Sequence, residues 1–519
     1  MANSSLKRLF TDTVIYGMSS IVGRFLNYLL VPLYTYKIAA SSGGYGVVTE
    51  VYAYTALLLV ILTFGMETTF FYFANRQAND SAAGGTDSGG DKAGADKGWS
   101  GKVFSTAALT VGFVGVLFLA GVFGLIDPIS SALGYTSHPE YLTMMAAVVA
   151  LDAFQAIFFV FLRFQHRPWK FAALKLLFVV CNIGLNLFIF LLAPALAVSH
   201  PGLMAWYNPD YQVGYIFLVN LICTGGITLF FLPEMRLLRH GVDFRLLGQM
   251  LRYTWPLLLF GIAGILNQVA DKICFRHLVP GSEGEVQLGI YGACVKIAMI
   301  MVLITQAFRY AYEPFVFAGG RSKENKENQA QVMKYFVVFA LFAFLAVMVY
   351  LDLFRYIISP SYWEGLRVVP IVMMAEIFMS IYFNLSFWYK LTGQTWWGAV
   401  FSAIGCVVLL GVNILFVPRY GYMACAWGGF AGYGVCMVLS YLVGQKKSPV
   451  PYRLAPLAGY FALALGLYAV SAWLRSATTL STGWQIAIGT LLLMVYIAVV
   501  AYNEQNLVKG ILRKLHLLR

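Results

Sequence analysis

The chain has 519 residues, of which 60% are hydrophobic and only 11% are charged, and its mean hydropathy is +0.73. A soluble domain carries about 25% charged residues, so this composition excludes a soluble globular protein and indicates a polytopic membrane protein. The formal net charge of +13 is assigned to membrane topology rather than nucleic-acid binding, because no basic surface is interleaved with aromatic residues.

Fourteen apolar segments follow one another along the chain, each close to the ~20 residues that a helix needs to cross a bilayer. They predict an all-α polytopic membrane protein with 14 transmembrane helices. The first segment is too long for the apolar part of a signal peptide, so we expect it to remain as a membrane helix. The segments begin near Thr11, Val47, Lys102, Tyr141, Phe171, Val213, Leu251, Leu288, Val332, Val368, Trp397, Tyr422, Leu454 and Trp484.

The first segment, residues 11–37, carries a polar stripe with a cation near its middle. Gly17, Ser20, Arg24 and Asn27 are three or four residues apart, so they share one helix face. An arginine at bilayer depth costs roughly 2.5 kcal/mol or more, and it normally faces a protein interior or a watery cavity. We therefore predict that Arg24 and Asn27 bind substrate. The alternative is that Arg24 pairs with a carboxylate and only fixes neighbouring helices.

Residues 79–100, after the second segment, are small, polar and Gly-rich. This composition predicts a disordered cytoplasmic insertion. The adjoining Gly101-Lys102 pair is an incomplete match to a phosphate-binding loop, because Asp96 replaces the first glycine and Val103 follows the lysine. No nucleotide site is predicted there.

The two halves of the chain resemble each other. The stripe of the first helix corresponds to Gly261, Gly264, Gln268 and Asp271 at a constant offset of 244, and Asp152 corresponds to Glu376 at an offset of 224. Six helices per repeat is an even number, so both repeats have one orientation and a pseudo-twofold axis along the membrane normal. We predict an N-terminal bundle over residues 1–240, a C-terminal bundle over 241–449, and two appended helices with a basic tail over 450–519.

Lysines and arginines indicate the orientation of the chain. Placing the N-terminus in the cytoplasm puts 25 of them at inside ends and loops and seven at outside ends. Cytoplasmic loops carry the excess of these residues, so both termini are predicted to be cytoplasmic.

Three cations in two apolar segments, the first and the eighth, suggest the chemistry of the substrate. Arg24, Lys296 and Arg309 would favour an anionic, phosphate-bearing ligand, because arginine offers a bidentate fork and lysine a point charge. Asn27 and Gln268 would add hydrogen bonds. The six histidines and seven cysteines form no cluster with ligand spacing, so neither a metal nor a cofactor is predicted.

Three carboxylates in apolar segments are candidates for ion coupling. Asp271 continues the polar stripe of the seventh helix and is the first choice. Asp152 and Glu376 occupy equivalent repeat positions, and interhelical hydrogen bonding explains them as well as proton coupling does.

Several stretches are similar to one known group of transporters. They are YGMSSIVGRFLNYLLVPLYT, GMETTFFYF, LGIYGACVKIAMI, FNLSFWYKLTGQT and FVPRYGYMACAWG. From about Leu6 to Tyr502 the chain resembles the polysaccharide-transporter branch of the multidrug/oligosaccharidyl-lipid/polysaccharide (MOP) flippase superfamily. The resemblance implies a fourteen-helix flippase of the bacterial inner membrane with a cationic central cavity, and Arg24 stands where related flippases carry an arginine.

The resemblance also implies a function and partners. Such flippases move an undecaprenyl-diphosphate-linked oligosaccharide to the periplasmic leaflet by alternating access, and glycosyltransferases and a glycan polymerase act before and after them. Without an ATP motif, a proton gradient, a sodium gradient or the membrane potential must supply the energy, and the protein is not expected to be an enzyme. Two alternatives are a multidrug exporter of the same superfamily and an integral-membrane glycan polymerase, ligase or acyltransferase. The outside loops 127–140 and 195–212 are short for such an enzyme.

Overall fold

The structure is a computed structural model, and it describes residues 16–19, 21–23, 25–26, 28–83, 92–202, 204–319, 322–477 and 481–505. These residues are predominantly helical and contain no strand. Thirteen helices within them are long and apolar enough to cross a membrane. The predicted class, an all-α polytopic membrane protein, is therefore confirmed. The first predicted segment is described only in part, as α2 (Leu30–Lys37) and short pieces before it, so the count of 14 stays a prediction.

The chain forms two compact units, which are described separately: Met1–Gly292 with Asn413–Tyr422, and Ala293–Val412 with Met423–Arg519. The division predicted at residues 240 and 449 remains a prediction. Within the first unit lie α2, η1 (Ala40–Ser42), α3 (Gly44–Thr63), α4 (Met66–Ala83), α5 (Lys92–Gly124), α6 (Ile126–Leu133), α7 (Pro139–Phe164), α8 (Pro168–Leu187), the π-helical turn η2 (Phe188–Leu192), α9 (Ala193–Ser199), α10 (Gln212–Leu229), α11 (Leu232–Met235), η3 (Arg236–His240), α12 (Phe244–Leu278) and the first turns of α13 (Ser282–Gly319).

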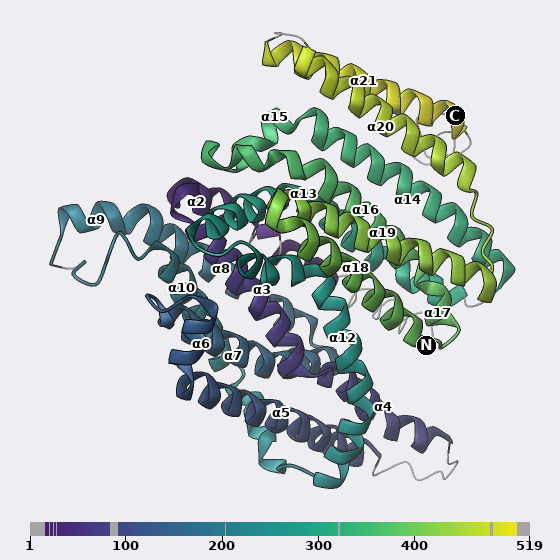
Figure 1. Cartoon of the computed structure of the whole chain (residues 1–519). Helices are drawn as coiled ribbons and strands as arrows, with labels where there is room; N and C mark the ends of the chain where they lie inside the picture. Colours follow the sequence, from purple (N-terminus) through teal and green to yellow (C-terminus); the bar gives the residue numbers. More distant parts are fainter. Residues whose placement is uncertain are drawn as a thin grey trace. The chain divides into compact units, whose positions relative to one another are not determined.

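The second unit contains the rest of α13 and the helices that follow it (Figure 1). They are α14 (Lys323–Val349), α15 (Leu351–Phe354), η4 (Arg355–Ile357), η5 (Pro360–Val368), α16 (Val369–Leu385), α17 (Phe387–Leu391), α18 (Trp396–Tyr420, whose last turns belong to the first unit), α19 (Tyr422–Lys447), α20 (Leu454–Ala477) and α21 (Thr482–Asn503). The last two helices pack against each other and against α14.

Each predicted segment start after the first falls inside one of the thirteen spans. The largest differences occur where a helix begins with polar turns before its apolar stretch. Asp243 caps α12 by accepting a hydrogen bond from the Leu246 amide at 3.0 Å, and Ser322 caps α14 by accepting one from the Asn325 amide at 3.1 Å. A side-chain cap satisfies backbone donors at the helix start, so these helices begin earlier than hydropathy indicates.

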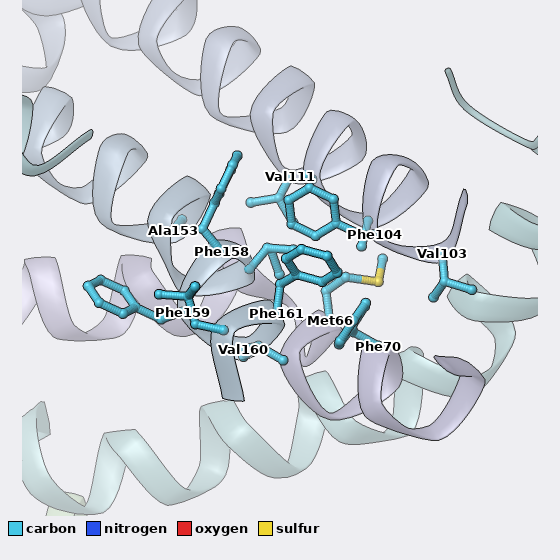
Figure 2. Close-up of a cluster of buried hydrophobic side chains, with 14 of the residues drawn as sticks. Met66, Phe70, Val103, Phe104, Val111, Ala153, Phe158, Phe159, Val160 and Phe161 are labelled. Atoms are coloured by element: carbon cyan, nitrogen blue, oxygen red, sulfur yellow. The ribbon is translucent and has the colours of Figure 1, made fainter. Parts of the chain in front are cut away.

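The core of the first unit is aromatic, and Figure 2 shows its centre. Phe104 of α5 stacks on Phe161 of α7 with ring centroids 4.3 Å apart and meets Phe158 edge-on at 5.1 Å. Met66 and Phe70 of α4 are fully buried beside them. Such aromatic pairs add ~0.5–1.5 kcal/mol to the burial of their area. This core fixes α4, α5 and α7 to one another.

Two of the predicted features lie wholly or partly outside the described residues. Arg24 and Asn27 are not described, so the stripe of the first helix cannot be followed as a surface. The predicted insertion over 79–100 overlaps the last turn of α4 and the first turns of α5, and its residues 84–91 are not described.

Candidate functional site

The described candidates for substrate binding lie on two helices. Gln268 is exposed on α12 in the first unit, whereas Lys296 and Arg309 are half-buried on α13 in the second unit. The guanidinium carbon of Arg309 lies 4.4 Å from the centroid of the Phe383 ring, within the range of a cation–π interaction. All five substrate-binding residues, Arg24 and Asn27 included, therefore remain predictions.

Asp271 is buried on α12, and partners surround its carboxylate. The hydroxyl of Tyr291, in the first turns of α13, donates a hydrogen bond to Asp271 Oδ2 at 2.8 Å. The ammonium of Lys272 lies 2.9 and 3.0 Å from the two carboxylate oxygens, and it also donates to the Gln268 carbonyl at 3.1 Å. A buried carboxylate is stable only when it is paired and hydrogen-bonded. Asp271 meets that condition with groups that are adjacent in the chain or on the next helix.

Asp152 and Glu376 lie in different units. In the first unit, Asp152 is half-buried on α7, and the ammonium of Lys175 on α8 lies 4.0 Å from the centroid of the Phe159 ring. In the second unit, Glu376 is half-buried on α16 and its backbone carbonyl accepts a hydrogen bond from the Ser380 hydroxyl at 2.6 Å. Their role in coupling is still a prediction.

A second buried carboxylate, Glu50 of α3, forms the centre of a larger polar cluster. Glu50 is only 1% exposed. The Tyr135 hydroxyl donates to Glu50 Oε2 at 2.6 Å, and the Arg276 guanidinium reaches the same oxygen at 3.4 Å. The other terminal nitrogen of Arg276 lies 2.6 Å from a Glu285 oxygen and donates to the Gly134 carbonyl at 2.9 Å. Arg276 on α12 therefore ties together α3, the loop after α6 and the first turn of α13.

Tyr135 lies outside the membrane-spanning helices, in the loop between α6 and α7. Burial, together with the charge of the neighbouring Glu50, raises the pKa of Tyr135 well above its usual range. The phenol therefore keeps its proton and remains a donor to the carboxylate. The Arg276 guanidinium carbon lies 4.4 Å from the centroid of the Tyr135 ring, so one side chain makes an ion pair, a hydrogen bond and a cation–π contact.

Gly134 combines a backbone conformation that favours glycine with a close contact to the Arg276 guanidinium. Its φ of +74° lies in the left-handed region that glycine adopts without strain. A Cβ at this position would also lie 2.9 Å from the nearest guanidinium nitrogen of Arg276. A side chain here would displace the arginine from the Gly134 carbonyl.

The sequence alone does not identify this cluster. By sequence alone, Arg276 is one of the seven basic residues at outside ends, and the repeat aligns Glu50 with Lys296 at an offset of 246. One signal is present, because a glutamate inside a membrane segment requires a partner. Nothing in the spacing of the chain shows that the partner comes from α12, 226 positions away.

The described residues contain no group of three or more histidine, cysteine, aspartate or glutamate side chains that could hold a metal ion. The remaining ion pairs of interest lie near helix ends. Lys390 pairs with Glu313 at 2.9 Å in the second unit, and Lys170 pairs with Glu234 at 2.6 Å in the first.

The fold of this chain also occurs in proteins of known structure. No family model matches the chain, and no curated protein matches it. Solved structures do. The lipid II flippase MurJ in an inward closed conformation has a TM-score of 0.64 at 12% identity, with 94% of this chain and 99% of that chain covered. An inward-facing multidrug resistance transporter of the MATE family of the MOP superfamily has a TM-score of 0.60 at 15% identity, covering 84% of this chain and 94% of that one.

A third structure is similar to a lesser degree. A mutant form of the Vibrio cholerae MATE transporter VcmN has a TM-score of 0.51 at 12% identity over 86% of this chain and 97% of that chain. At these identities the likeness concerns the fold. This chain has the fold shared by the MATE transporters and the flippase MurJ.

Proposed function

We propose that the protein is a flippase that moves an undecaprenyl-diphosphate-linked oligosaccharide from the cytoplasmic to the periplasmic leaflet of a bacterial inner membrane. It acts by alternating access, without covalent chemistry, and supplies surface polysaccharide biosynthesis. Glycosyltransferases make its substrate, and a glycan polymerase consumes its product.

One observation carries the proposal: the fold likeness to a lipid II flippase extends over 94% of this chain and 99% of that one. The MATE likeness covers 84% of this chain. The difference is about the length of two membrane helices. A transporter of a lipid-linked diphosphate has the same task as a lipid II flippase, namely to carry a charged headgroup while a long hydrocarbon chain stays in the membrane.

The cations in the membrane segments support an anionic substrate. Arg24, Lys296 and Arg309 are the proposed diphosphate ligands, and Asn27 and Gln268 are the proposed hydrogen-bond donors to phosphate or sugar. Charge-assisted hydrogen bonds to phosphate are about twice as strong as neutral ones. A multidrug exporter that binds cationic drugs would need an acidic site, and these basic residues do not fit such a site.

The proposed coupling residue is Asp271, and Asp152 and Glu376 are the second choices. The Asp271 carboxylate is held by Lys272 and Tyr291 at hydrogen-bond distance. A proton or a sodium ion that bound Asp271 would compete with Lys272 for the carboxylate. Binding of the ion would therefore release the Lys272 ammonium from Asp271. A proton or sodium gradient can drive this local rearrangement.

The test replaces Arg24 in a strain whose surface glycan depends on this protein. We expect Arg24→Ala to lower surface glycan roughly tenfold or more at equal protein level, because a charge-assisted bond of ~1.5–3 kcal/mol is lost. Lipid-linked precursor should accumulate, and Arg24→Lys should restore part of the transport. Arg419→Ala is the matched control, because Arg419 is exposed at the end of α18. Undiminished glycan in Arg24→Ala would overturn the anionic-site proposal.

Multidrug export is the second candidate, and the likeness to MATE transporters favours it. It predicts that deletion of the gene increases sensitivity to cationic drugs and leaves surface glycan intact. The flippase proposal predicts the opposite pattern, so the two measurements in one deletion strain separate the candidates.

A further inference from the structure

Two cavities adjoin each other at the start of α20 in the second unit. One has a volume of about 290 Å³ and lies among α14, α16, α19 and α20. The other has a volume of about 440 Å³ and lies between α14 and the segment that leads from α19 into α20. Leu457 lines both cavities, so the two lie next to each other.

The smaller cavity is lined by hydrocarbon and aromatic side chains. Its walls include Met333, Leu385, Met437, Tyr452 and Phe461. Apolar pockets accept apolar ligands, and the volume is close to the lower limit of common ligand pockets, ~300 Å³. A segment of a hydrocarbon chain suits this cavity.

Charged side chains line the larger cavity, and one of them already forms an ion pair. Lys334 is already held by Glu504, whose two oxygens lie 2.7 Å from the ammonium. Arg453 and Glu327 also line the cavity and are exposed. In the part of the chain that the structure describes, neither of them forms an ion pair. The cavity thus offers one available cation and one available anion.

We propose that the two cavities together bind one phosphatidylethanolamine molecule. Arg453 takes the phosphate, since a guanidinium presents a planar fork of donors to phosphate oxygens. Glu327 takes the primary ammonium, which has three donors for a carboxylate as a lysine does. A hydrocarbon chain of the lipid enters the apolar cavity past Leu457.

The charge pattern selects this headgroup over the others available in a membrane. Phosphatidylglycerol and undecaprenyl phosphate carry a phosphate but no ammonium, so Glu327 would remain unpaired and would repel them. Phosphatidylcholine carries a cation without N–H donors, so it cannot hydrogen-bond to the carboxylate. The segments around the site, with Lys334, Lys446, Lys447 and Arg453, are those predicted to face the cytoplasm. Basic pockets between membrane helices on that side bind the phosphate groups of lipid headgroups.

The experiment measures lipid retention by the purified full-length protein. The protein is mixed with equal amounts of phosphatidylethanolamine, phosphatidylglycerol, phosphatidylcholine and undecaprenyl phosphate, and bound lipid is counted by native mass spectrometry. We expect phosphatidylethanolamine to be retained preferentially. Arg453→Gln should lower its retention roughly tenfold or more, and Glu327→Gln should abolish the preference over phosphatidylglycerol while phosphatidylglycerol itself is retained as well or better.

A third variant tests the apolar half. Ala458 lines the smaller cavity and is exposed, so Ala458→Trp should fill the cavity without disturbing the core and lower retention of every lipid. The controls are Ala469→Trp, eleven residues further along the same face of α20, and Arg419→Gln. Both should bind as the unmodified protein does.

Three results would overturn the proposal. They are equal retention of phosphatidylethanolamine and phosphatidylcholine by the unmodified protein, unchanged retention in Arg453→Gln, and displacement of phosphatidylethanolamine by an equal amount of undecaprenyl phosphate. The last result would assign the site to the isoprenoid chain of the proposed substrate. Because glycan transport is not measured, the outcome is independent of the proposed flippase function.

Discussion

At the scale of single residues, Arg276 lies near the end of α12 but has a structural role. It holds two carboxylates, Glu50 and Glu285, and the Gly134 carbonyl. Burying an ion pair gains little, because desolvation offsets the attraction between the charges. Removing one member costs much more, because the other charge stays buried without a partner. Glu50, at 1% exposed, is in that position.

We therefore expect Arg276→Ala to lower the free energy of unfolding by about 3–5 kcal/mol. The effect is measured by thermal unfolding of the purified protein in detergent, monitored as the loss of its monodisperse peak in size-exclusion chromatography. Arg252→Ala on the same helix is the control, because Arg252 is exposed. The double variant Arg276→Gln with Glu50→Gln should recover stability, since no buried charge remains. Arg276→Ala that unfolds at the temperature of the unmodified protein would contradict this account.

At the scale of elements, α3 and the first turns of α13 meet backbone to backbone. A Cβ at Gly46 would collide with the Glu285 carbonyl, and one at Gly289 would lie 2.9 Å from the Gly46 nitrogen. A Cβ at Gly292 would collide with the Thr49 side chain. Small residues at helix contacts allow this close approach in membranes, where no water-driven burial holds the helices together.

Gly46→Ala should separate these two helices and destabilise the first unit. We expect a loss of ~1–3 kcal/mol, the usual cost of forcing a methyl group into a packed contact, measured by the same unfolding assay. Gly466→Ala on α20 is the matched control, because a Cβ there meets nothing within 4 Å. That change should be neutral or stabilising by up to ~1 kcal/mol, as alanine is the better helix former. Equal effects of the two substitutions would refute the close-contact explanation.

At the scale of the whole molecule, hydropathy predicted the described membrane helices, because the length of an apolar segment is set by the bilayer. It could not predict where α12 and α14 begin, since the caps Asp243 and Ser322 lie outside the apolar stretches. The cost of burial indicates that Asp271 needs partners, and Lys272 and Tyr291 supply them. The Glu50 cluster depends on contacts between distant segments, which periodicity along one helix does not record.

The orientation of the chain is a whole-molecule prediction that two cysteines can test. The excess of lysines and arginines, 25 against seven, predicts a cytoplasmic α13–α14 connection and a periplasmic loop between α6 and α7. Ser137→Cys and Lys323→Cys place exposed thiols at these sites, in a background with Cys181→Ser and Cys274→Ser, since the other five cysteines are buried. A membrane-impermeant maleimide should label Ser137→Cys in intact spheroplasts and Lys323→Cys only after lysis. The reverse pattern would place Arg453 and Glu327 at the periplasmic surface and reverse the direction of the proposed transport, because every loop exchanges sides when one does.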